Sequence, residues 1–343
     1  MYYDAEEIMF RDNQKFLEHL RDIESNTIWR NIPLNELFVE HGTTSHDEAD
    51  YDTCVRGTNL FACRQGELFT TGIRECAIRS LYDRLGLGGK ILERLDAPAL
   101  EELFTFAIKH SSEDELQVPV VDGKINAFLS SQYKALPAEK VFSELLEYLR
   151  KSFNQEEFKF NGYWTYFAQT GEFELPDKRM INGQEFDVVL VCKTSDAGYS
   201  GVNFSVYIKS GNLKLPIMSD IALMHKGDLN EDKLKEALNQ LEKVIDNGVK
   251  KLNDLLKVYI ENPKGCMKRI AKEVNLPKRD TLEYIENYED RGITTAFDCY
   301  TTLARLLDDD NLTWSAKERL QGNLYRALGL SWQKFDLPGD FAW

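Results

Sequence analysis

The stretch Asp-Gly-Lys-Ile-Asn-Ala-Phe-Leu-Ser-Ser-Gln-Tyr-Lys-Ala-Leu, at residues 122–136, lies between two segments with helical periodicity. Its Asp122-Gly123 pair separates two apolar runs, at 118–121 and 125–129. Asp-Gly in this setting favours a two-residue turn, because such a turn requires positive φ at both central positions. We therefore predict a β-hairpin, which joins a helical part of the chain to a strand-rich part.

Helical periodicity flanks the hairpin on both sides. Before it, apolar residues recur at four-residue steps from Ile73 to Leu85. After it, residues 138–151 show the same period, which is typical of an amphipathic helix. The same reasoning predicts further helices at 13–24, 90–95 and 98–110, extended chain at 32–39, and short strands at 59–63 and 68–71.

Residues 202–209 alternate between apolar and polar side chains, which predicts a strand with one buried face. Further strands are predicted at 163–169, 185–192 and 213–218. The expected fold class is α+β, with a central antiparallel sheet, flanking helices and a C-terminal helical domain. The expected domains are an acidic mixed segment at 1–116, a sheet domain at 117–230 and a helical domain at 231–343.

A long apolar stripe follows the sheet. Apolar residues keep three-and-four spacing from Leu234 to Tyr259, and only Gly248 interrupts them. Such a stripe either packs against helices of its own chain or forms a coiled coil with a partner. Oligomerisation through the helix at 231–260 is therefore one candidate interaction.

The formal charge of the chain is -15 at pH 7, and residues 1–116 hold 12 Lys and Arg against 23 Asp and Glu. An acidic protein repels a polyphosphate at long range, so nucleic-acid binding requires a local basic patch. The segment 240–280 is the candidate, since it holds ten basic and six acidic residues.

No apolar run reaches the roughly 18 residues of a membrane-spanning helix, and the first residues lack the basic and apolar regions of a signal peptide. The six cysteines include no Cys-x-x-Cys pair, which favours buried free thiols in a reducing compartment. We therefore expect a protein of the host-cell cytoplasm that makes no membrane contact.

Metal and catalytic motifs are weak in this chain. The acidic loop at 41–52 carries His, Asp and Glu, but its spacing fits neither a calcium loop nor a helical His pair. The glycines at 86–89 end a helix instead of following a strand, which argues against a phosphate-binding loop. No serine has a nucleophile-elbow context, and the scattered histidines, of which His225 is the least ordinary, predict no triad. We expect a non-enzymatic protein without cofactor or metal.

Two segments carry a family resemblance: Cys-Ala-Ile-Arg-Ser-Leu-Tyr-Asp-Arg-Leu-Gly-Leu at 76–87 and Asp-Gly-Lys-Ile-Asn-Ala-Phe-Leu-Ser-Ser-Gln-Tyr at 122–133. Together with the turn at 194–198 and the helix at 295–300, they resemble the uncharacterised phage/plasmid-like proteins of bacterial viruses and other mobile elements. Asn126 and Gln132 stand where the resemblance leads us to expect arginines, which removes two charges that favour phosphate contact. The resemblance implies a mobile-element origin and a similar architecture, and nothing catalytic.

Association with single-stranded DNA in replication or recombination is the first functional hypothesis. Single-strand binders combine stacking rings with lysines on an open sheet, and the candidate rings are Tyr133, Tyr163, Trp164, Tyr166, Tyr199 and Tyr207. The segment 269–277 also resembles the first half of a helix-turn-helix, although Thr281 stands where an apolar residue is expected. The expected contact residues are Lys124, Tyr133, Lys134, Lys209, Lys268, Arg269 and Lys272. The competing interpretation places the rings in the core.

The alternative hypothesis is a protein-binding effector that inhibits a host factor or a defence system. Its working surface is then the acidic first third of the chain, which mimics nucleic-acid charge or docks on a basic patch. The competing interpretation is ordinary solubilising charge. Rings and lysines on one open sheet face favour DNA, whereas a buried sheet with a continuous acidic surface favours a protein partner.

Overall fold

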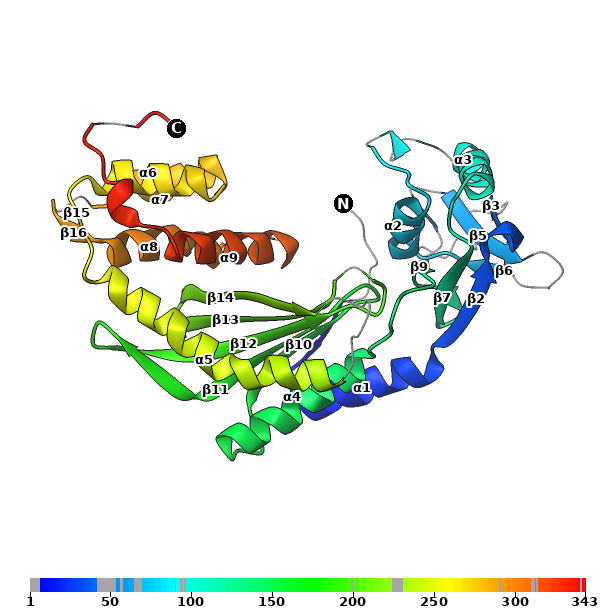
Figure 1. Cartoon of the computed structure of the whole chain (residues 1–343), viewed down its shortest axis with the longest axis horizontal. Coiled ribbons are helices and arrows are strands. Elements are labelled where there is room, and N and C mark those ends of the chain that lie inside the picture. Colours follow the sequence, from blue (N-terminus) through cyan, green and yellow to red (C-terminus); the bar gives the residue numbers. More distant parts are fainter. Residues whose placement is uncertain are drawn as a thin grey trace.

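The computed structural model describes residues 7–41, 54–55, 58–64, 70–89, 91–92, 95, 97–198, 200–223, 231–289, 292–309, 312, 314–339 and 341–343. Within these residues the chain forms a large antiparallel sheet, smaller sheets, and helices that concentrate toward the C-terminus (Figure 1). This confirms the predicted α+β class. Residues 42–52 of the acidic loop, Tyr199 and His225 lie outside the described residues.

The large sheet has the strand order β1-β10-β11-β12-β13-β14, and each neighbouring pair is antiparallel. Its strands are β1 (Ile8–Phe10), β10 (Lys159–Trp164), β11 (Gln169–Ile181), β12 (Gln184–Thr194), β13 (Val202–Ser210) and β14 (Leu213–Leu223). The strands predicted at 185–192, 202–209 and 213–218 are confirmed. The strand predicted at 163–169 is only partly correct: residues 163–164 end β10 and Gln169 begins β11, but between them the Thr165 N–H donates to the Ala168 carbonyl in a turn.

Three helices cover one face of the large sheet (Figure 1). They are α1 (Asn13–Asn26), α4 (Ala138–Phe153) and α5 (Glu231–Leu255), each expected from its periodicity. Phe16 of α1 meets Phe142 of α4 edge to face, with ring centroids 5.0 Å apart. Gly171 of β11 makes room for this cluster, because an added Cβ there lies 2.8 Å from the Phe142 ring.

The apolar stripe of α5 belongs to the core of its own chain. Leu234, Leu241 and Leu252 are all buried, although no second chain is present. Packing within the chain therefore covers the apolar face of α5, and oligomerisation through the helix at 231–260 stays a prediction.

Smaller sheets and two helices form the part of the chain that we call the N-terminal module, residues 28–130. One sheet consists of β2 (Ile28–Pro33), β7 (Glu115–Val121), β8 (Lys124–Ile125) and β9 (Leu129–Ser130), and the other of β3 (Leu37–His41), β4 (Cys54–Val55), β5 (Thr58–Arg64) and β6 (Thr70–Gly72). The helices are α2 (Glu75–Arg84) and α3 (Ala97–Lys109). The module has a core of its own, which includes Ile32, Phe104 and Phe128.

The β-hairpin predicted around Asp122-Gly123 forms between β7 and β8. Asp122 and Gly123 have φ values of 50° and 76°, as the predicted two-residue turn requires. The second strand is shorter than predicted, because the chain leaves the ladder after Ile125 and returns only at Leu129. Asn126 is thereby free to enter the junction between the module and the large sheet.

The strand pairing does not follow the expected domain boundaries. β1 pairs with β10 and α1 packs on α4, so the beginning of the chain belongs to the large sheet. β7 crosses the boundary expected at residue 116 and pairs with β2. One hydrophobic core extends from Phe16 to Trp332, so the expected sheet and helical domains share it.

The C-terminal helices lie on the opposite side of the sheet from α5 (Figure 1). They are α6 (Pro263–Glu273), α7 (Lys278–Glu286), α8 (Ala296–Ala304) and α9 (Trp314–Leu328). α8 and α9 pack on β14, where the buried Tyr300 hydroxyl donates to the Pro216 carbonyl at 2.9 Å. None of the helices in the described part of the chain is both long enough and apolar enough to cross a bilayer.

Candidate functional site

The predicted DNA-contact residues lie on separate parts of the molecule. Lys124 is in β8 of the N-terminal module and Lys134 lies just after that module, whereas Lys209 is in β13 of the large sheet. Lys268, Arg269 and Lys272 are in α6, at the far end of the C-terminal helices (Figure 1). The structure therefore does not gather these residues into one surface.

Tyr133 is packed inside the molecule instead of presenting its ring to a base. Its side chain is only 8% exposed, its ring stacks on Trp29 and its hydroxyl donates to the Ser195 carbonyl at 3.3 Å. Burial, and then the nearby Asp196, raise the pKa of Tyr133. The stacking role predicted for Tyr133 is therefore wrong. The other buried rings among the candidates are Trp164, Tyr166 and Tyr207.

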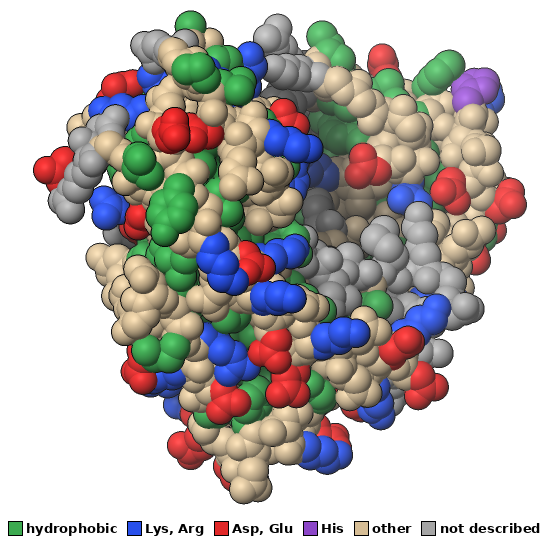
Figure 2. Space-filling model, turned by 60° about the vertical axis from the view of Figure 1, so that its left-hand side comes forward, with side chains coloured by type: hydrophobic (Ala, Val, Ile, Leu, Met, Phe, Trp, Pro, Cys, Tyr) green, Lys and Arg blue, Asp and Glu red, His purple; other side chains and the backbone are tan. Residues whose placement is uncertain are grey.

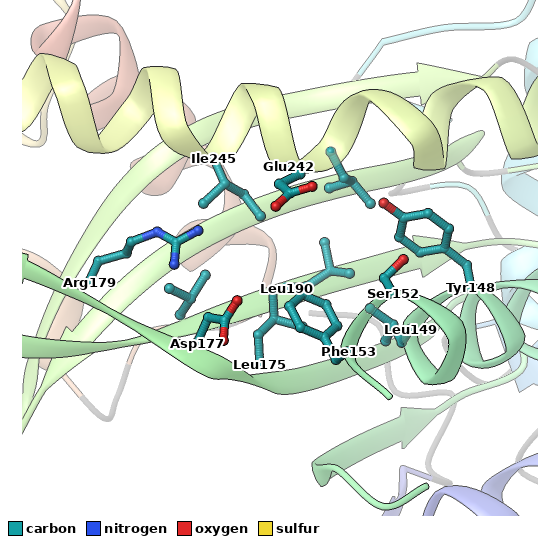
Figure 3. A pocket seen from close by; sticks show the side chains of 12 residues that line it. Tyr148, Leu149, Ser152, Phe153, Leu175, Asp177, Arg179, Leu190, Glu242 and Ile245 are labelled. Carbon is teal, nitrogen blue, oxygen red and sulfur yellow. The ribbon is translucent and has the colours of Figure 1, made fainter. Parts of the chain in front are cut away.

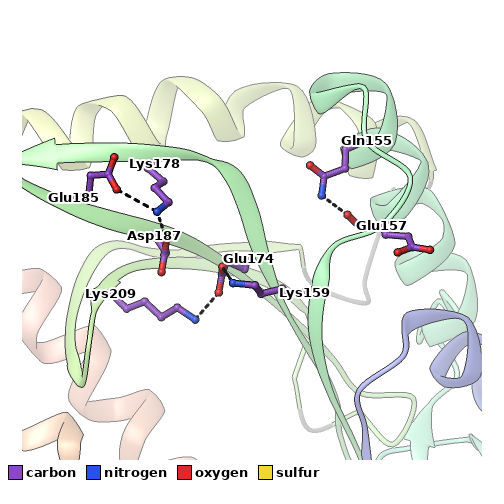
Figure 4. Close-up of polar contacts among 8 residues, drawn as sticks. All are labelled: Gln155, Glu157, Lys159, Glu174, Lys178, Glu185, Asp187 and Lys209. Carbon is purple, nitrogen blue, oxygen red and sulfur yellow. Dashed lines mark hydrogen bonds and ion pairs between the residues drawn. The ribbon is translucent and has the colours of Figure 1, made fainter.

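Lysines on the face of the sheet opposite α5 are held by acidic residues. Glu174 receives Lys159 from the neighbouring strand and Lys209 from β13, each at 2.6 Å (Figure 4). Partial burial raises the pKa of Glu174, but the two ion pairs outweigh it and the net pKa is lowered. Lys178 similarly contacts Glu185 at 3.2 Å. This face is a balanced charge network and not a basic track.

The basic residues of α6 are likewise engaged. Lys268 pairs with Glu286 of α7 at 2.9 Å. Arg269 and Lys272 lie over the ring of Phe341, 5.0 and 5.3 Å from its centroid. The short connection between α6 and α7 does give a helix-turn-helix, and the buried Thr281 hydroxyl donates to Pro277. However, α7 carries more acidic than basic side chains, which opposes major-groove binding.

The charges show no single-sign surface on the side seen in Figure 2. Lys and Arg side chains alternate there with Asp and Glu side chains, including around the hollow in that face. A continuous acidic surface is therefore not visible on this side either. This face therefore does not carry the charge of one sign that would steer a strongly charged partner toward it.

One cavity, of about 70 Å³, lies between α4, α5 and the β11–β12 pair. Figure 3 shows the polar groups of Asp177, Arg179 and Glu242 around apolar side chains such as Leu190. Arg179 is already paired with Asp246 of α5 at 3.2 Å. Since its base is the apolar core, this cavity is best understood as a packing gap under a charged rim.

Buried polar side chains gather at a second place, the junction between the N-terminal module and the large sheet. Arg74 is 1% exposed, lies 3.4 Å from the centroid of the Tyr166 ring and donates to the Val121 carbonyl at 3.2 Å. Asn126, from the hairpin stretch, donates to the Tyr166 carbonyl at 2.6 Å. Asp122 accepts from the Tyr166 hydroxyl at 3.1 Å. The hairpin stretch therefore places a polar centre where two parts of the fold meet.

A cavity of about 40 Å³ opens at this junction, and we call it the junction cavity. Its aromatic lining is Trp29, Trp164 and Tyr166, and its acidic lining is Glu24 and Asp196. Gln169 also lines it. Among the described residues, neither the Gln169 Oε1 nor the Trp164 Nε1 has a hydrogen-bond partner, although both atoms are buried. Buried polar atoms without partners are rare, so this cavity is the candidate functional site.

The Asp196 carboxylate lies at the start of α4, where it accepts from the Ala138 N–H at 3.4 Å. Burial raises the pKa of Asp196 to about 7, and the neighbouring Glu24 adds to the shift. Burial and then Glu139 raise the pKa of Glu24 as well. Two carboxyl groups with raised pKa values, the exposed Glu24 and the partly buried Asp196, thus line one small cavity.

This pKa predicts a pH-dependent effect of Asp196→Asn. Because the folded-state pKa lies above the unfolded value, Asp196 favours folding below about pH 4, and this contribution is lost as the pH rises through about 7. The substitution should therefore stabilise the protein at pH 8, on the order of 2 kcal/mol, and have little effect at pH 4. Urea denaturation at both pH values measures this, and equal effects at the two would contradict it.

The named cavity residues come from α1, β2, the turn between β10 and β11 with its flanking residues, and the turn after β12, which are far apart in the sequence. Sequence reasoning included Trp164 and Tyr166 only as stacking rings, and it missed Glu24, Gln169 and Asp196. Comparison of the chain with protein-family models, curated proteins and solved structures found no match.

Proposed function

We propose that this chain is a non-enzymatic accessory protein of a phage or another mobile element, and that it binds a host protein through the free edge of β2. The mobile-element origin rests on the resemblance of residues 76–87 and 122–133. The binding mode rests on β2, the edge strand of its sheet, where Ile28 is 55% and Trp29 is 41% exposed. A large exposed tryptophan on a strand edge is typical of a pairing surface.

The ladder defines which peptide groups of β2 face outward. The Pro119 carbonyl accepts from the Asn126 N–H on the β8 side of β7, so residues 118 and 120 direct their peptide groups toward β2. Their partners Arg30 and Ile28 therefore face β7, and Trp29 and Asn31 direct their N–H and C=O groups to the free edge. No strand in the described part of the chain pairs with that edge. An extended segment of another protein fits it by strand addition.

Asn31→Pro tests this binding mode. Proline removes the outward N–H of residue 31 and leaves the ladder between β2 and β7 intact, which is where an edge strand tolerates proline. Host proteins that the wild-type chain retains should be retained equally by Asn31→Ala and lost from Asn31→Pro. Retention of the same proteins by all three forms, or of none by the wild type, would overturn the proposal. Dimers of the wild type that Asn31→Pro abolishes would show that a second copy occupies the edge.

Single-stranded DNA is expected to bind only weakly. The candidate stacking rings are largely buried and the sheet lysines are ion-paired. Neither base stacking nor lysine–phosphate contacts can therefore contribute strongly to the affinity for single-stranded DNA. In fluorescence anisotropy with single-stranded oligonucleotides we expect a Kd above about 10 μM at 50 mM salt. Submicromolar binding that weakens steeply at 200 mM salt would instead favour the DNA hypothesis.

A further inference from the structure

We propose that the junction cavity binds an organic cation, an ammonium or guanidinium group, between the carboxylates of Glu24 and Asp196 and against the indoles of Trp29 and Trp164. Such a group comes either from a lysine or arginine side chain of the protein that pairs with β2, or from a free polyamine. Only the first source rests on the proposed function.

Aromatic rings make the cavity suitable for a cation. Trp29 and Trp164 both line it, and ring faces attract ammonium and guanidinium groups, tryptophan most strongly. At the same junction the Arg74 guanidinium lies over the Tyr166 ring, so the carboxylates of the cavity must outweigh this positive charge when a second cation binds. Trp29 is also part of the free edge strand, so a partner that pairs with β2 reaches the opening of the cavity.

An unused acceptor and an unused donor point to a missing ligand. Gln169 is 4% exposed, yet its Oε1 has no partner among the described residues, while its Nε2 donates to the Thr165 carbonyl at 3.0 Å. A cationic N–H group satisfies this oxygen. The Trp164 indole, 2% exposed, has an unpartnered Nε1, which a water molecule that enters with the cation satisfies.

The charges around the cavity select a cation over an anion. Glu24 on α1 raises the pKa of Asp196. Glu139 at the start of α4 in turn raises the pKa of Glu24, and Lys140 of α4 opposes this effect. Arg21, the nearest arginine of α1, is held by Glu139 at 2.8 Å. A cation between Glu24 and Asp196 relieves their mutual repulsion, whereas an anion increases it.

The size of the cavity restricts the ligand to a small head group. A volume of about 40 Å³ corresponds to roughly three water molecules. An ammonium or guanidinium group with one accompanying water molecule fits this volume, whereas a nucleobase or a sugar ring does not. The alkyl chain of the ligand then passes the half-exposed Trp29 toward solvent.

Titration of the full chain with defined probes tests the cavity directly. The probes are N-acetyl-lysine amide, N-acetyl-arginine amide and spermidine, with N-acetyl-norleucine amide as the neutral control of matched shape. Calorimetry and tryptophan fluorescence at pH 8 should show saturable binding of the cations, with a Kd on the order of 1 mM, and none of the control. Between pH 8 and pH 6 the affinity should fall about tenfold, because Asp196 takes up a proton with a pKa of about 7.

Matched variants separate the cavity from general charge effects. Asp196→Asn and Glu24→Gln should each weaken the binding of the cations about fivefold or more, with the fold verified by circular dichroism. Glu18→Gln removes the same charge from an exposed position of α1 and should leave binding unchanged. Equal binding of the norleucine control, or unchanged affinity in both cavity variants, would overturn the inference.

The probes also distinguish the two sources and the two proposals. Spermidine that binds at least tenfold more tightly than the amides identifies a free polyamine as the ligand, and amides that bind as well as spermidine identify a side chain. If Asn31→Pro retains every host protein while the amides still bind, the strand-addition proposal fails and the cation site stands. If the probes do not bind while Asn31→Pro loses its partner, the reverse holds.

Discussion

Gly248→Ala is expected to lower the free energy of unfolding by about 2 kcal/mol or more, although alanine is the better helix former. An added Cβ at residue 248 lies 2.3 Å from the Ile217 carbonyl oxygen and 2.8 Å from the Ile217 Cβ. The obstacle is the backbone of β14, which is fixed in the sheet. The helix α5 must therefore move away from the sheet, and the packing of its buried apolar side chains is loosened. Overpacking of this kind costs about 1–3 kcal/mol and more when backbone must move, which exceeds the roughly 1 kcal/mol gained in helix propensity.

Gly322→Ala is the matched control for this prediction. Gly322 is also inside a helix, α9, but nothing lies within 4 Å of a Cβ placed there. Alanine at 322 should therefore stabilise the protein by up to about 1 kcal/mol. Urea denaturation of the two variants, followed by circular dichroism, compares them with the wild type. Similar changes of the same sign in both would show that α5 does not approach β14 this closely.

Gly248 also illustrates how far the sequence leads. The three-and-four spacing predicts a long helix with a buried stripe, and α5 has both. In the pattern alone, however, Gly248 is an interruption, and the stripe fits a partner helix as well as the chain's own sheet. The contact between Gly248 and Ile217 of β14 decides for the chain's own sheet. The apolar spacing within α5 contains no information about this strand. Periodicity specifies a face of an element, whereas its partner depends on tertiary packing.

The candidate site was harder to predict for the same reason. The turn at Asp122-Gly123 follows from local backbone chemistry and is present as expected. By contrast, Tyr133 and Trp164 are of the residue types that stack on bases, but both are buried. Their burial depends on elements that are distant in the sequence. Asn126 stands where the resemblance led us to expect an arginine. Its side-chain amide donates a hydrogen bond to the Tyr166 carbonyl within the junction.

Arg74→Ala is expected to destabilise the protein by about 3–5 kcal/mol. The guanidinium of Arg74 bridges two parts of the fold, since it donates to Val121 of the N-terminal module and lies over Tyr166 of the large sheet. Its truncation leaves a cavity between them, and the buried Val121 carbonyl loses this donor. Because the contact is at the junction, the N-terminal module should unfold at a lower urea concentration than the large sheet. Tryptophan fluorescence should then show an early partial change from Trp29, the tryptophan of the module, before the main change in far-ultraviolet circular dichroism.

Arg79→Ala and Arg74→Lys identify the origin of this effect. Arg79 is exposed on α2, the helix that Arg74 precedes as its N-cap residue, so its truncation should change stability by no more than about 0.5 kcal/mol. Lysine at 74 keeps the positive charge but lacks the planar group that stacks on Tyr166 and donates in a fixed direction. Arg74→Lys should therefore recover less than half of the loss. If lysine restores full stability, charge alone holds the junction, and the ring contact with Tyr166 contributes little.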